Sequence, residues 1–406
     1  MSEHGSAILV RVNSPRASRH TPYDGDAVVI LDEIVRHACN AGASDIHIEP
    51  KRDRMQVRFR IDGTMIEHRS ITTDLGPQVV SRIKVLARMD IAERRLPQDG
   101  QMTLELGLSQ RTHLRASTFP SSQGEKVVLR ILRQQSIYAF DRLGMGADVM
   151  QRVRIHLNAP QGLIITCGPT GAGKTSTLYA FLQQIDTTKI NVVTLEDPIE
   201  VEIDGITQGQ TNARQGFTFA GGLRSILRQD PDVILVGEMR DAETAGIALQ
   251  AALTGHLVMS TLHTSDAVET IVRLVDLGVE PWIVANAMTA VLAQRLVRVV
   301  CPACRDGGVL ETDLWDGDEV LLPSGSPIVR PRGCVQCHRT GYRGRTGIFE
   351  FVEMDDDLRE MIKTKASARD YRDLLRKRNV RSLRRAGFDR VQEGITTIDE
   401  VVRVTS

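Results

Sequence analysis

The chain has 406 residues, which predicts two or three domains and gives ample length for a large buried core. A hydrophobic share of 41% excludes wholesale disorder. The 51 basic residues are balanced by 51 acidic residues, so the chain lacks the bulk positive charge that supplies non-specific affinity for DNA. Only a local basic patch is left as a candidate surface for nucleic acid.

We expect residues 1–25 to form a flexible tail, because their short apolar piece is flanked by polar residues and does not match an export signal. Residues 244–265 contain no charged side chain and could be mistaken for a membrane span. Polar residues such as Gln250 and His256 interrupt them, and Gly255 is typical of a helix end. A buried helix followed by a short strand is predicted there instead.

An α+β domain, which we interpret as PAS-like, is predicted over residues 26–135. Its patterns predict helices at 26–42 and 79–89 and strands at 44–49, 56–61, 101–108, 111–119 and 126–133. The pair Asp62-Gly63 indicates a hairpin after the second of these strands.

A change of pattern follows a predicted linker at residues 136–147. Helices then alternate with short apolar strands over residues 148–300, which favours a parallel sheet with crossover helices, an α/β fold of the nucleotide-binding class. The strands are expected at 163–166, 191–195, 233–236 and 257–259. A cysteine-rich subdomain over 301–345 and a charged helical segment over 346–406 complete the predicted domains. Gly221-Gly222 begins a predicted helix without an evident reason, although each glycine can cost ~1 kcal/mol there.

A glycine-rich loop follows the strand at 163–166. It fits the P-loop pattern G-x-x-x-x-G-K-[ST] and comprises Gly168, Pro169, Thr170, Gly171, Ala172, Gly173, Lys174, Thr175 and Ser176. Its glycines allow backbone N–H groups to face phosphate oxygens, and the following helix adds the positive end of its dipole. We therefore expect Lys174 to contact the β- and γ-phosphates of a nucleotide and Thr175 to ligate Mg²⁺.

Acidic residues end two of the neighbouring strands. Glu238 follows the strand at 233–236 and Glu196 follows the strand at 191–195, so both are expected at the carboxyl edge of the sheet, near the P-loop. P-loop enzymes usually carry an aspartate at this position to hold the Mg²⁺ shell, so glutamate favours contact with the metal through water. Either carboxylate is a candidate to orient the water that attacks the γ-phosphate. Asp197 precedes a proline and has the competing explanation of a turn residue.

His256 and His263 flank the strand predicted at 257–259. We expect both at the rim of the phosphate site, where they would sense the γ-phosphate or bridge to a neighbouring chain. A purely structural role is the alternative. The other eight histidines are interpreted as structural or surface residues.

Four of the six cysteines form two C-x-x-C pairs with twenty-nine residues between the pairs, namely Cys301, Cys304, Cys334 and Cys337. Two such pairs are typical of a closed tetrahedral Zn²⁺ site. A redox-active pair is the rival interpretation, but the helix of a thioredoxin-like setting is absent from the pattern. His338 is an alternative fourth ligand.

Taken together, the motifs resemble those of the ATPases of type II secretion and type IV pilus assembly, the GspE/PilB family. The resemblance runs from about residue 26 to the end and is carried by the P-loop, the four cysteines and residues 44–47, 92–100, 124–132, 194–200, 227–232, 237–241, 254–264 and 341–347.

The resemblance implies a homohexameric ring of two-lobed subunits with a RecA-like P-loop core. Such a ring would hydrolyse Mg-ATP at the cytoplasmic face of the bacterial inner membrane and drive a membrane platform protein that assembles pilin-like subunits. The resemblance also assigns Arg115 and Arg130 of the first domain to phosphate contacts, although the sequence alone would make them ordinary strand residues. An arginine supplied by a moving domain would make hydrolysis depend on closure.

Three further expectations complete the prediction. The tetracysteine loop favours the assembly or secretion branch over the retraction branch. Only about 25 residues precede the first domain, where many secretion ATPases carry a larger domain that binds an inner-membrane recruiter, so the mode of recruitment is left open. A RecA-like DNA motor and a nucleotide-binding adaptor are the alternatives. The zero net charge and the aromatic share of 4% argue against the first, and no nucleic-acid partner is expected.

Overall fold

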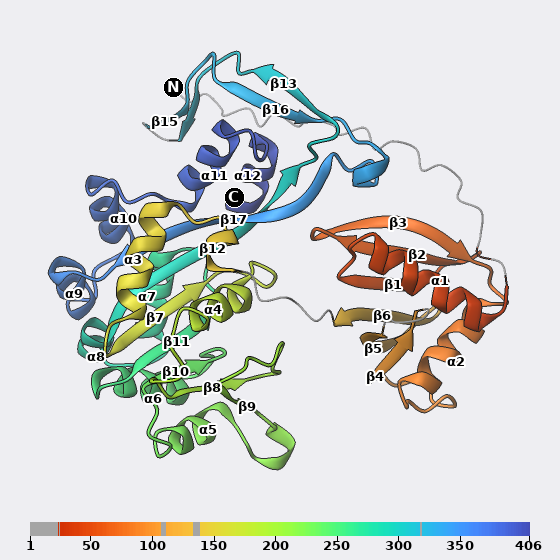
Figure 1. The fold of residues 1–406 in the computed structure, drawn as a ribbon, viewed down its shortest axis with the longest axis horizontal. Coiled ribbons are helices and arrows are strands. Elements are labelled where there is room, and N and C mark those ends of the chain that lie inside the picture. Colours follow the sequence, from red (N-terminus) through yellow and green to blue (C-terminus); the bar gives the residue numbers. More distant parts are fainter. Residues whose placement is uncertain (1–22, 24, 107–110, 133–138, 317–318) are drawn as a thin grey trace, which may run out of the picture. The chain divides into compact units, whose positions relative to one another are not determined.

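The computed structural model describes residues 23, 25–106, 111–132, 139–316 and 319–406 (Figure 1). The chain divides into two compact units between Arg133 and Gln134. Most of the predicted tail at 1–25 and the beginning of the predicted linker lie outside the described residues. Among the helices of the described ranges, none combines the length and the apolar character that a membrane span requires.

The first unit is built around a six-stranded antiparallel sheet. Its strands follow the order β3-β2-β1-β6-β5-β4 across the sheet. They comprise Asp45–Pro50 (β1), Met55–Ile61 (β2), Thr64–Ile71 (β3), Gln98–Glu105 (β4), Arg111–Ser121 (β5) and Gly124–Leu132 (β6). The predicted hairpin is confirmed, because Asp62 and Gly63 both have positive φ and connect β2 to β3.

Two helices, α1 (Ala27–Asn40) and α2 (Gly76–Leu86), share one apolar core with this sheet. Alternate strand residues such as Phe59, Leu114 and Leu129 belong to that core. Since successive side chains of a strand point to opposite faces, the residues between them lie on the other face, and many of these are charged. The alternating pattern of the sequence therefore corresponds to a sheet with one buried face.

The second unit contains a seven-stranded sheet in the order β17-β12-β7-β11-β10-β8-β9. Its strands comprise Gly162–Cys167 (β7), Val192–Glu196 (β8), Thr207–Gln210 (β9), Val233–Val236 (β10), Leu257–Leu262 (β11), Met288–Val300 (β12) and Tyr342–Glu353 (β17). The strands predicted in the P-loop region correspond to β7, β8, β10 and β11, and these pair in parallel. Every residue of these four strands is buried, as expected for a sheet covered on both faces.

Helices cover both faces of this sheet (Figure 1). Leu163 and Ile165 of β7 pack into one core with α5 (Phe219–Ile226), α6 (Ala242–Leu253), α7 (Ala267–Asp276) and α8 (Pro281–Ala287). Ile164 points to the opposite face and packs with α3 (Ala147–Leu157) and α4 (Lys174–Leu182). The predicted α/β class is confirmed, and the helix and strand predicted within residues 244–265 are α6 and β11.

The edge strand of the sheet comes from far along the chain. β17 pairs antiparallel with β12, and the cysteine-rich subdomain is inserted between them. That subdomain contains Arg305–Val309 (β13), Leu314–Asp316 (β14), Glu319–Leu322 (β15) and Pro327–Pro331 (β16). The helical segment expected over 346–406 begins only at Asp356, because residues 347–352 are buried in β17, which pairs with β12.

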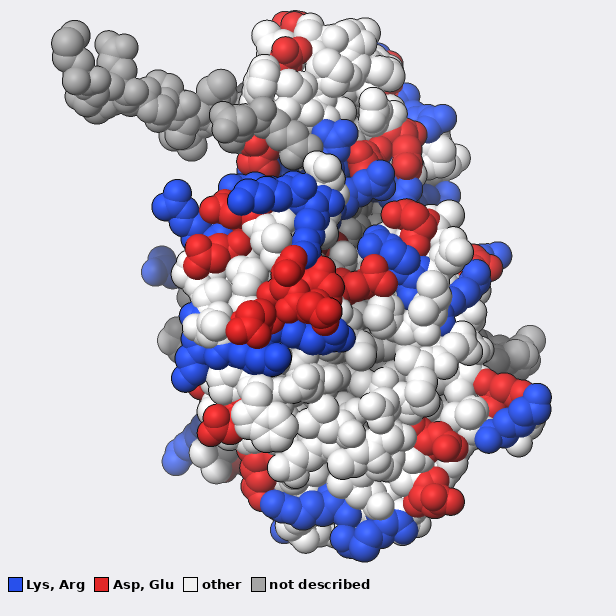
Figure 2. Space-filling model, turned by 90° about the vertical axis from the view of Figure 1, so that its left-hand side faces the viewer, with Lys and Arg blue, Asp and Glu red and all other residues white. Residues whose placement is uncertain are grey.

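Four short helices close the chain: Asp356–Lys363 (α9), Ala368–Lys377 (α10), Leu383–Gln392 (α11) and Ile398–Thr405 (α12). Figure 2 shows the side of the molecule that carries α9 and α10, where basic and acidic side chains are interleaved. Arg378, for example, pairs with both Asp355 and Asp357. This described face therefore carries mixed charge, in line with the balanced composition.

One of the two adjacent glycines of α5, Gly222, has a structural explanation. A β-carbon at Gly222 would lie 2.7 Å from Cδ2 of Leu195 on β8 and 3.2 Å from the ring of Phe217. Gly222 thus allows α5 to approach the strand that ends at Glu196 more closely than an alanine would. A β-carbon at Gly221 would make only an ordinary contact, at 3.4 Å from Oγ1 of Thr218, so the presence of this glycine has no steric reason.

Candidate nucleotide site and metal centre

The P-loop lies at the carboxyl edge of the parallel sheet, between β7 and α4. Gly168, Gly171 and Gly173 all have positive φ, which lets the backbone turn sharply before the helix begins. A β-carbon at Gly168 would lie 2.6 Å from the carbonyl oxygen of Gln294 on β12. The amide of Gln294 in turn donates to the carbonyl of Ala172 at 2.7 Å. The loop conformation is therefore set both by its glycines and by the neighbouring strand.

Lys174, Glu238 and His263 come together at this edge. The amino group of Lys174 donates to the carbonyls of Gly168 (2.7 Å) and Pro169 (3.2 Å), inside the loop. It also lies 3.5 Å from Nδ1 of His263, whose Nε2 lies 3.6 Å from Oε2 of Glu238. A strand end, a P-loop lysine and a histidine from the next strand thus converge on one point.

The electrostatics of this cluster follow from its partial burial. Burial lowers the pKa of Lys174, and the carboxylate of Glu238 acts in the opposite direction. Burial also lowers the pKa of His263, and the nearby charge of Lys174 adds to this effect. His263 is therefore neutral near pH 7 and can donate one ring N–H while its other nitrogen accepts.

Glu238 is mostly buried, with 13% of its side chain exposed, and Arg240 forms an ion pair with Oε1. Oε2 faces His263. The carboxylate is thus held from one side by a guanidinium and left open to a polar group on the other. This arrangement suits a residue that contacts a metal shell or a water molecule.

Glu196 lies in a different environment, although it ends the adjacent strand. It is 3% exposed and accepts hydrogen bonds from Thr194 (2.6 Å) and Gln208 (3.1 Å) at Oε1 and from the Tyr179 hydroxyl at Oε2. Burial, together with the charge of Glu196, raises the pKa of Tyr179 strongly, so this hydroxyl remains a donor. Glu196 is thus held in one orientation by three donors, which leave one of the roughly four acceptor sites of a carboxylate for another donor.

The structure separates the two histidines that we expected at one rim. His263 follows the carboxyl end of β11, next to the P-loop, whereas His256 precedes its amino end. Seven residues of strand span roughly 20 Å, so His256 lies far from the phosphate end of its own subunit. Its Nδ1 contacts the carbonyl of Ala251 at 3.0 Å. The expectation that His256 lies at the same rim is wrong for a single chain, because the strand has opposite ends.

Arg115 and Arg130 are direct neighbours across β5 and β6, on the polar face of the first unit. Arg130 is 68% exposed and its Nε contacts Oδ1 of Asp45 at 3.0 Å. The same carboxylate also pairs with Arg60, at 3.6 Å. The first unit therefore presents a row of arginines on an exposed sheet face, anchored by one buried carboxylate.

The four cysteines form a compact cluster with no disulfide. Their sulfur atoms all lie within 4.8 Å of one another, and the closest pairs are separated by 3.7, 3.8 and 4.0 Å. A tetrahedron of thiolates with Zn–S bonds of about 2.3 Å has edges of about 3.8 Å. Backbone N–H groups of Gly333 and Gly341 donate to the sulfurs of Cys304 and Cys337, which favours thiolates. The donor set therefore fits zinc.

His338 is not part of this group among the described residues, so the alternative of a histidine ligand is not supported. It has a positive φ and follows the second cysteine pair in a tight turn. The conformation of the turn accounts for its position.

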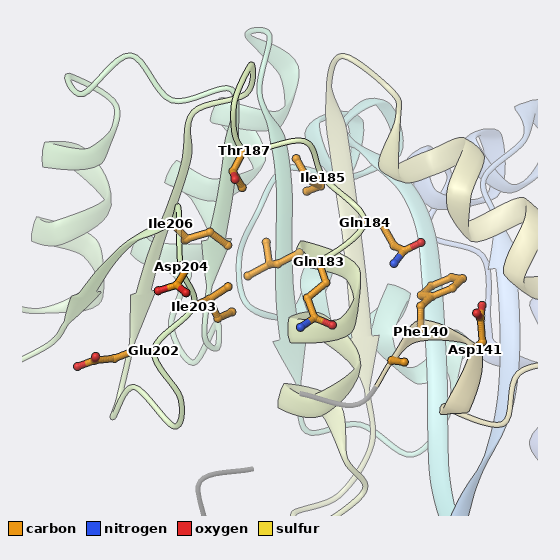
Figure 3. A pocket seen from close by; sticks show the side chains of 12 residues that line it. Phe140, Asp141, Gln183, Gln184, Ile185, Thr187, Glu202, Ile203, Asp204 and Ile206 are labelled. Atoms are coloured by element: carbon orange, nitrogen blue, oxygen red, sulfur yellow. The ribbon is translucent and has the colours of Figure 1, made fainter. Parts of the chain in front are cut away.

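A separate pocket of about 610 Å³ opens near the C-terminal end of α4 (Figure 3). Asp141, Glu202 and Asp204 line it together with Ile203 and Ile206. α4 has nine residues, so its two ends lie about 13 Å apart and the pocket is remote from the P-loop. Its carboxylates also make it unsuitable for phosphate groups.

Several residues that shape the site were not singled out from the sequence. Tyr179 and Gln208 hold Glu196, Arg240 pairs with Glu238, and Gln294 and Arg295 of β12 contact the P-loop and the segment after β11. Except for Arg240, which lies two residues after Glu238, each of these residues acts on a different strand, helix or loop, so its position carries no local pattern. Only the placement of Tyr179 on the P-loop helix could have suggested its role.

Comparisons with known proteins agree with this geometry. The family described as "Type II/IV secretion system protein" matches residues 23–403. "Type II secretion system protein E" of Pseudomonas aeruginosa is 46% identical over 386 residues, which cover 94% of this chain and 76% of that protein. "Type II secretion system ATPase E" of Vibrio cholerae is 45% identical over 385 residues, with the same coverage. "Type IV pilus assembly ATPase TfpB" of Acinetobacter baylyi is 42% identical and is covered to 66%.

Solved structures share the fold at lower identity. The ATPase DotB of Legionella pneumophila has a TM-score of 0.68 at 20% identity, with 96% of this chain and 97% of DotB covered. The pilus retraction motor PilT with bound ADP has a TM-score of 0.60 at 24% identity, with 92% and 96% covered. At identities of 20% and 24%, these similarities show the fold alone.

Proposed function

Because the chain belongs to the type II/IV secretion system protein family, we propose that its P-loop site hydrolyses Mg-ATP and that the energy drives assembly of a secretion pseudopilus or a type IV pilus. The protein is a secretion ATPase of the P-loop class. The observation that carries the mechanistic proposal is the convergence of Lys174, Glu238 and His263 at the carboxyl edge of the sheet.

The roles of the residues follow from their chemistry. The side chain of Lys174 and the backbone N–H groups of the P-loop, apart from Pro169, would bind the phosphates, and the hydroxyl of Thr175 would hold Mg²⁺, which neutralises charge on the β- and γ-phosphates. Glu238 suits contact with the metal shell through water. Glu196, fixed by three hydrogen bonds, would orient the attacking water, and neutral His263 would contact the γ-phosphate.

The first unit would complete the site. Arg115 and Arg130 lie together on an exposed face, where guanidinium groups are available to a phosphate. We propose that domain closure brings them to the nucleotide and that the machine is a homohexameric ring, in which His256 would act at a contact with a neighbouring subunit. Such an arrangement would make turnover depend on movement of the ring.

The protein would act as part of a secretion or pilus machine. We propose that it works at the cytoplasmic face of the inner membrane, where a platform protein receives the motion and a recruiter protein holds the ring in place. Zinc bound by Cys301, Cys304, Cys334 and Cys337 would have a structural role, because four thiolates leave no open position for substrate.

Glu238→Gln tests the catalytic assignment. We expect the variant to lose steady-state ATP hydrolysis while it binds ATP with a dissociation constant close to that of the wild type, because the P-loop contacts are unchanged. Glu360→Gln on α9 is the matched control, since Glu360 is exposed and pairs only with Lys363 among the described residues. Hydrolysis retained in Glu238→Gln would contradict the role of Glu238.

The same assay tests the substrate of the motor. Hydrolysis is measured in buffer, with single- and double-stranded DNA, and with vesicles of anionic lipid. Stimulation by vesicles and indifference to DNA are the expected results for a membrane-docked motor. Strong stimulation by DNA would instead favour a RecA-like DNA motor.

A further inference from the structure

The segment that follows His263 is held by residues that come later in the chain, on β12, β17 and α10. The guanidinium of Arg295 on β12 donates to the carbonyl of Ser265 at 2.7 Å. Arg372 of α10 pairs with Asp266 at 3.1 Å. The N–H of Ala267, the first residue of α7, donates to Oε1 of Glu350 at 3.0 Å. The segment is therefore fixed by tertiary contacts as well as by its own strand.

Glu350 holds more than one element. It lies on β17, is 8% exposed, and its second oxygen, Oε2, accepts the N–H of Leu383 at 3.2 Å. Leu383 begins α11, so one buried carboxylate joins the N-termini of α7 and α11. Two backbone donors and the positive ends of two helix dipoles compensate the cost of burying its charge.

The surroundings of Glu350 are also charged. Burial raises its pKa, Asp266 at the start of α7 acts in the same direction, and Arg295 on β12 acts in the opposite direction. Neither of these neighbours replaces the two backbone donors. Glu350 is thus the side chain that contacts the N-termini of both α7 and α11.

His263 lies four residues before Ala267. Thr264, directly after His263, shares a buried hydrogen bond of 2.6 Å with Thr270 of α7, and Thr270 also donates to the carbonyl of Asp266. These bonds tie the segment to α7 as one stiff unit. A displacement of the start of α7 is therefore transmitted to the ring of His263, which lies 3.5 to 3.6 Å from Lys174 and Glu238.

We propose that Glu350 is a positioning residue for His263, which it fixes through the N-terminus of α7 while it ties that helix to α11. The inference rests on the proposed function, because it deepens the role of His263 at the same site. Through Glu350, a shift of the C-terminal helix α11 would then change the position of His263 at the γ-phosphate end of the site.

Glu350→Gln tests the inference. Glutamine has the same shape, but its amide has one acceptor oxygen, and its NH₂ group would face the N–H of either Ala267 or Leu383. We expect kcat to fall by roughly ten- to a hundredfold, because misplacement of a contacting group by about 1 Å has effects of this size. The dissociation constant for ATP should stay within about twofold, since the P-loop is untouched.

Glu400→Gln is the matched control. Glu400 is 1% exposed and joins β12 to α12 by accepting hydrogen bonds from the backbone of Arg298 and the side chain of Arg403. It is therefore a buried carboxylate whose hydrogen-bond partners all lie outside the segment after His263. We expect a similar loss of thermal stability, with the kcat of the folded protein unchanged.

Hydrogen–deuterium exchange supplies a readout that does not depend on activity. The peptide that covers residues 264–270 should exchange faster in Glu350→Gln, because a neutral amide with one acceptor oxygen replaces the carboxylate that serves the N–H groups of both Ala267 and Leu383, and at the wild-type rate in Glu400→Gln. If Glu350→Gln does not fold, Glu350→Asp is measured in the same way, since its shorter side chain can reach only one of the two helices.

The outcomes separate the two proposals. A wild-type protein without ATP hydrolysis would overturn the proposed function, while exchange would still test the contact of Glu350. An active wild type together with unchanged exchange at 264–270, or with the same kcat in Glu350→Gln and Glu400→Gln, would overturn the inference. A change in ATP affinity without a change in kcat would overturn it as well.

Discussion

Replacement of Tyr179 by phenylalanine removes one hydroxyl from the site and keeps the buried ring. Tyr179 is 3% exposed and its hydroxyl donates to Oε2 of Glu196, whereas Thr194 and Gln208 both donate to Oε1. The substitution thus leaves one oxygen of a buried carboxylate without this donor. A hydrogen bond to a charged group contributes about 1.5–3 kcal/mol, so we expect the free energy of unfolding to fall by that amount.

Thermal unfolding measures this loss. The entropy of unfolding is about 2.1 cal/mol/K per residue, so a change of 1 kcal/mol shifts Tm of a unit that spans Gln134–Ser406 by about 2 °C, and Tm of the second unit should fall by roughly 3–6 °C. We also expect kcat to fall, because Glu196 is no longer held in one orientation, while ATP binding persists.

Tyr371→Phe provides the control for these measurements. Tyr371 is 2% exposed, burial raises its pKa to about 12, and its hydroxyl makes no hydrogen bond to the described part of the chain. Its loss should leave Tm almost unchanged. Equal values of Tm for the two variants would refute the reasoning, because they would show that the hydroxyl of Tyr179 contributes nothing to the buried carboxylate.

Two further predictions concern the metal centre and the response to acid. Metal analysis should find about one zinc per chain, lost together with thermal stability in Cys304→Ala, and a fully folded wild type without metal would contradict a four-thiolate site. Burial alone would raise the pKa of Glu400, but hydrogen bonds from Arg403 and Arg298 outweigh it and lower that pKa to about 2. The ionised Glu400 therefore stabilises the folded state fully at pH values above about 4.5, the pKa of glutamate in the unfolded chain, and this stabilisation is lost as pH falls towards 2. Over this range the free energy of unfolding of the wild type should lose about 3 kcal/mol from Glu400, and this loss should be absent in Glu400→Gln.

Local patterns predicted much of the site. The P-loop could be placed because its residues are contiguous and lie between an apolar strand and a helical pattern, and the structure has β7 and α4 at these places. Glu196 and Glu238 could be placed at the same edge because parallel strands share their carboxyl ends. The spacing of the four cysteines was enough to predict their cluster, because the two members of each C-x-x-C pair are already close in sequence and only the two pairs have to meet in the fold.

The partners of these residues could not be predicted in the same way. Gln208 and Gln294 look like ordinary polar residues in the sequence, and their roles depend on which strand or loop lies beside them. The misplacement of His256 has a related cause. His256 lies only seven residues before His263, but the extended backbone of β11 between them places the two histidines at opposite ends of the strand.

The sequence by itself determined the class of the fold, the P-loop, the acidic residues at the strand ends and the four-cysteine cluster, because each depends on contiguous residues or on simple periodicity. Only the tertiary structure decided that β17 returns to the edge of the sheet beyond the cysteine-rich insertion. The same return brings Glu350 to the N-termini of α7 and α11. Pairing between strands so far apart is selected by burial in the complete core, and no local pattern of residues encodes it.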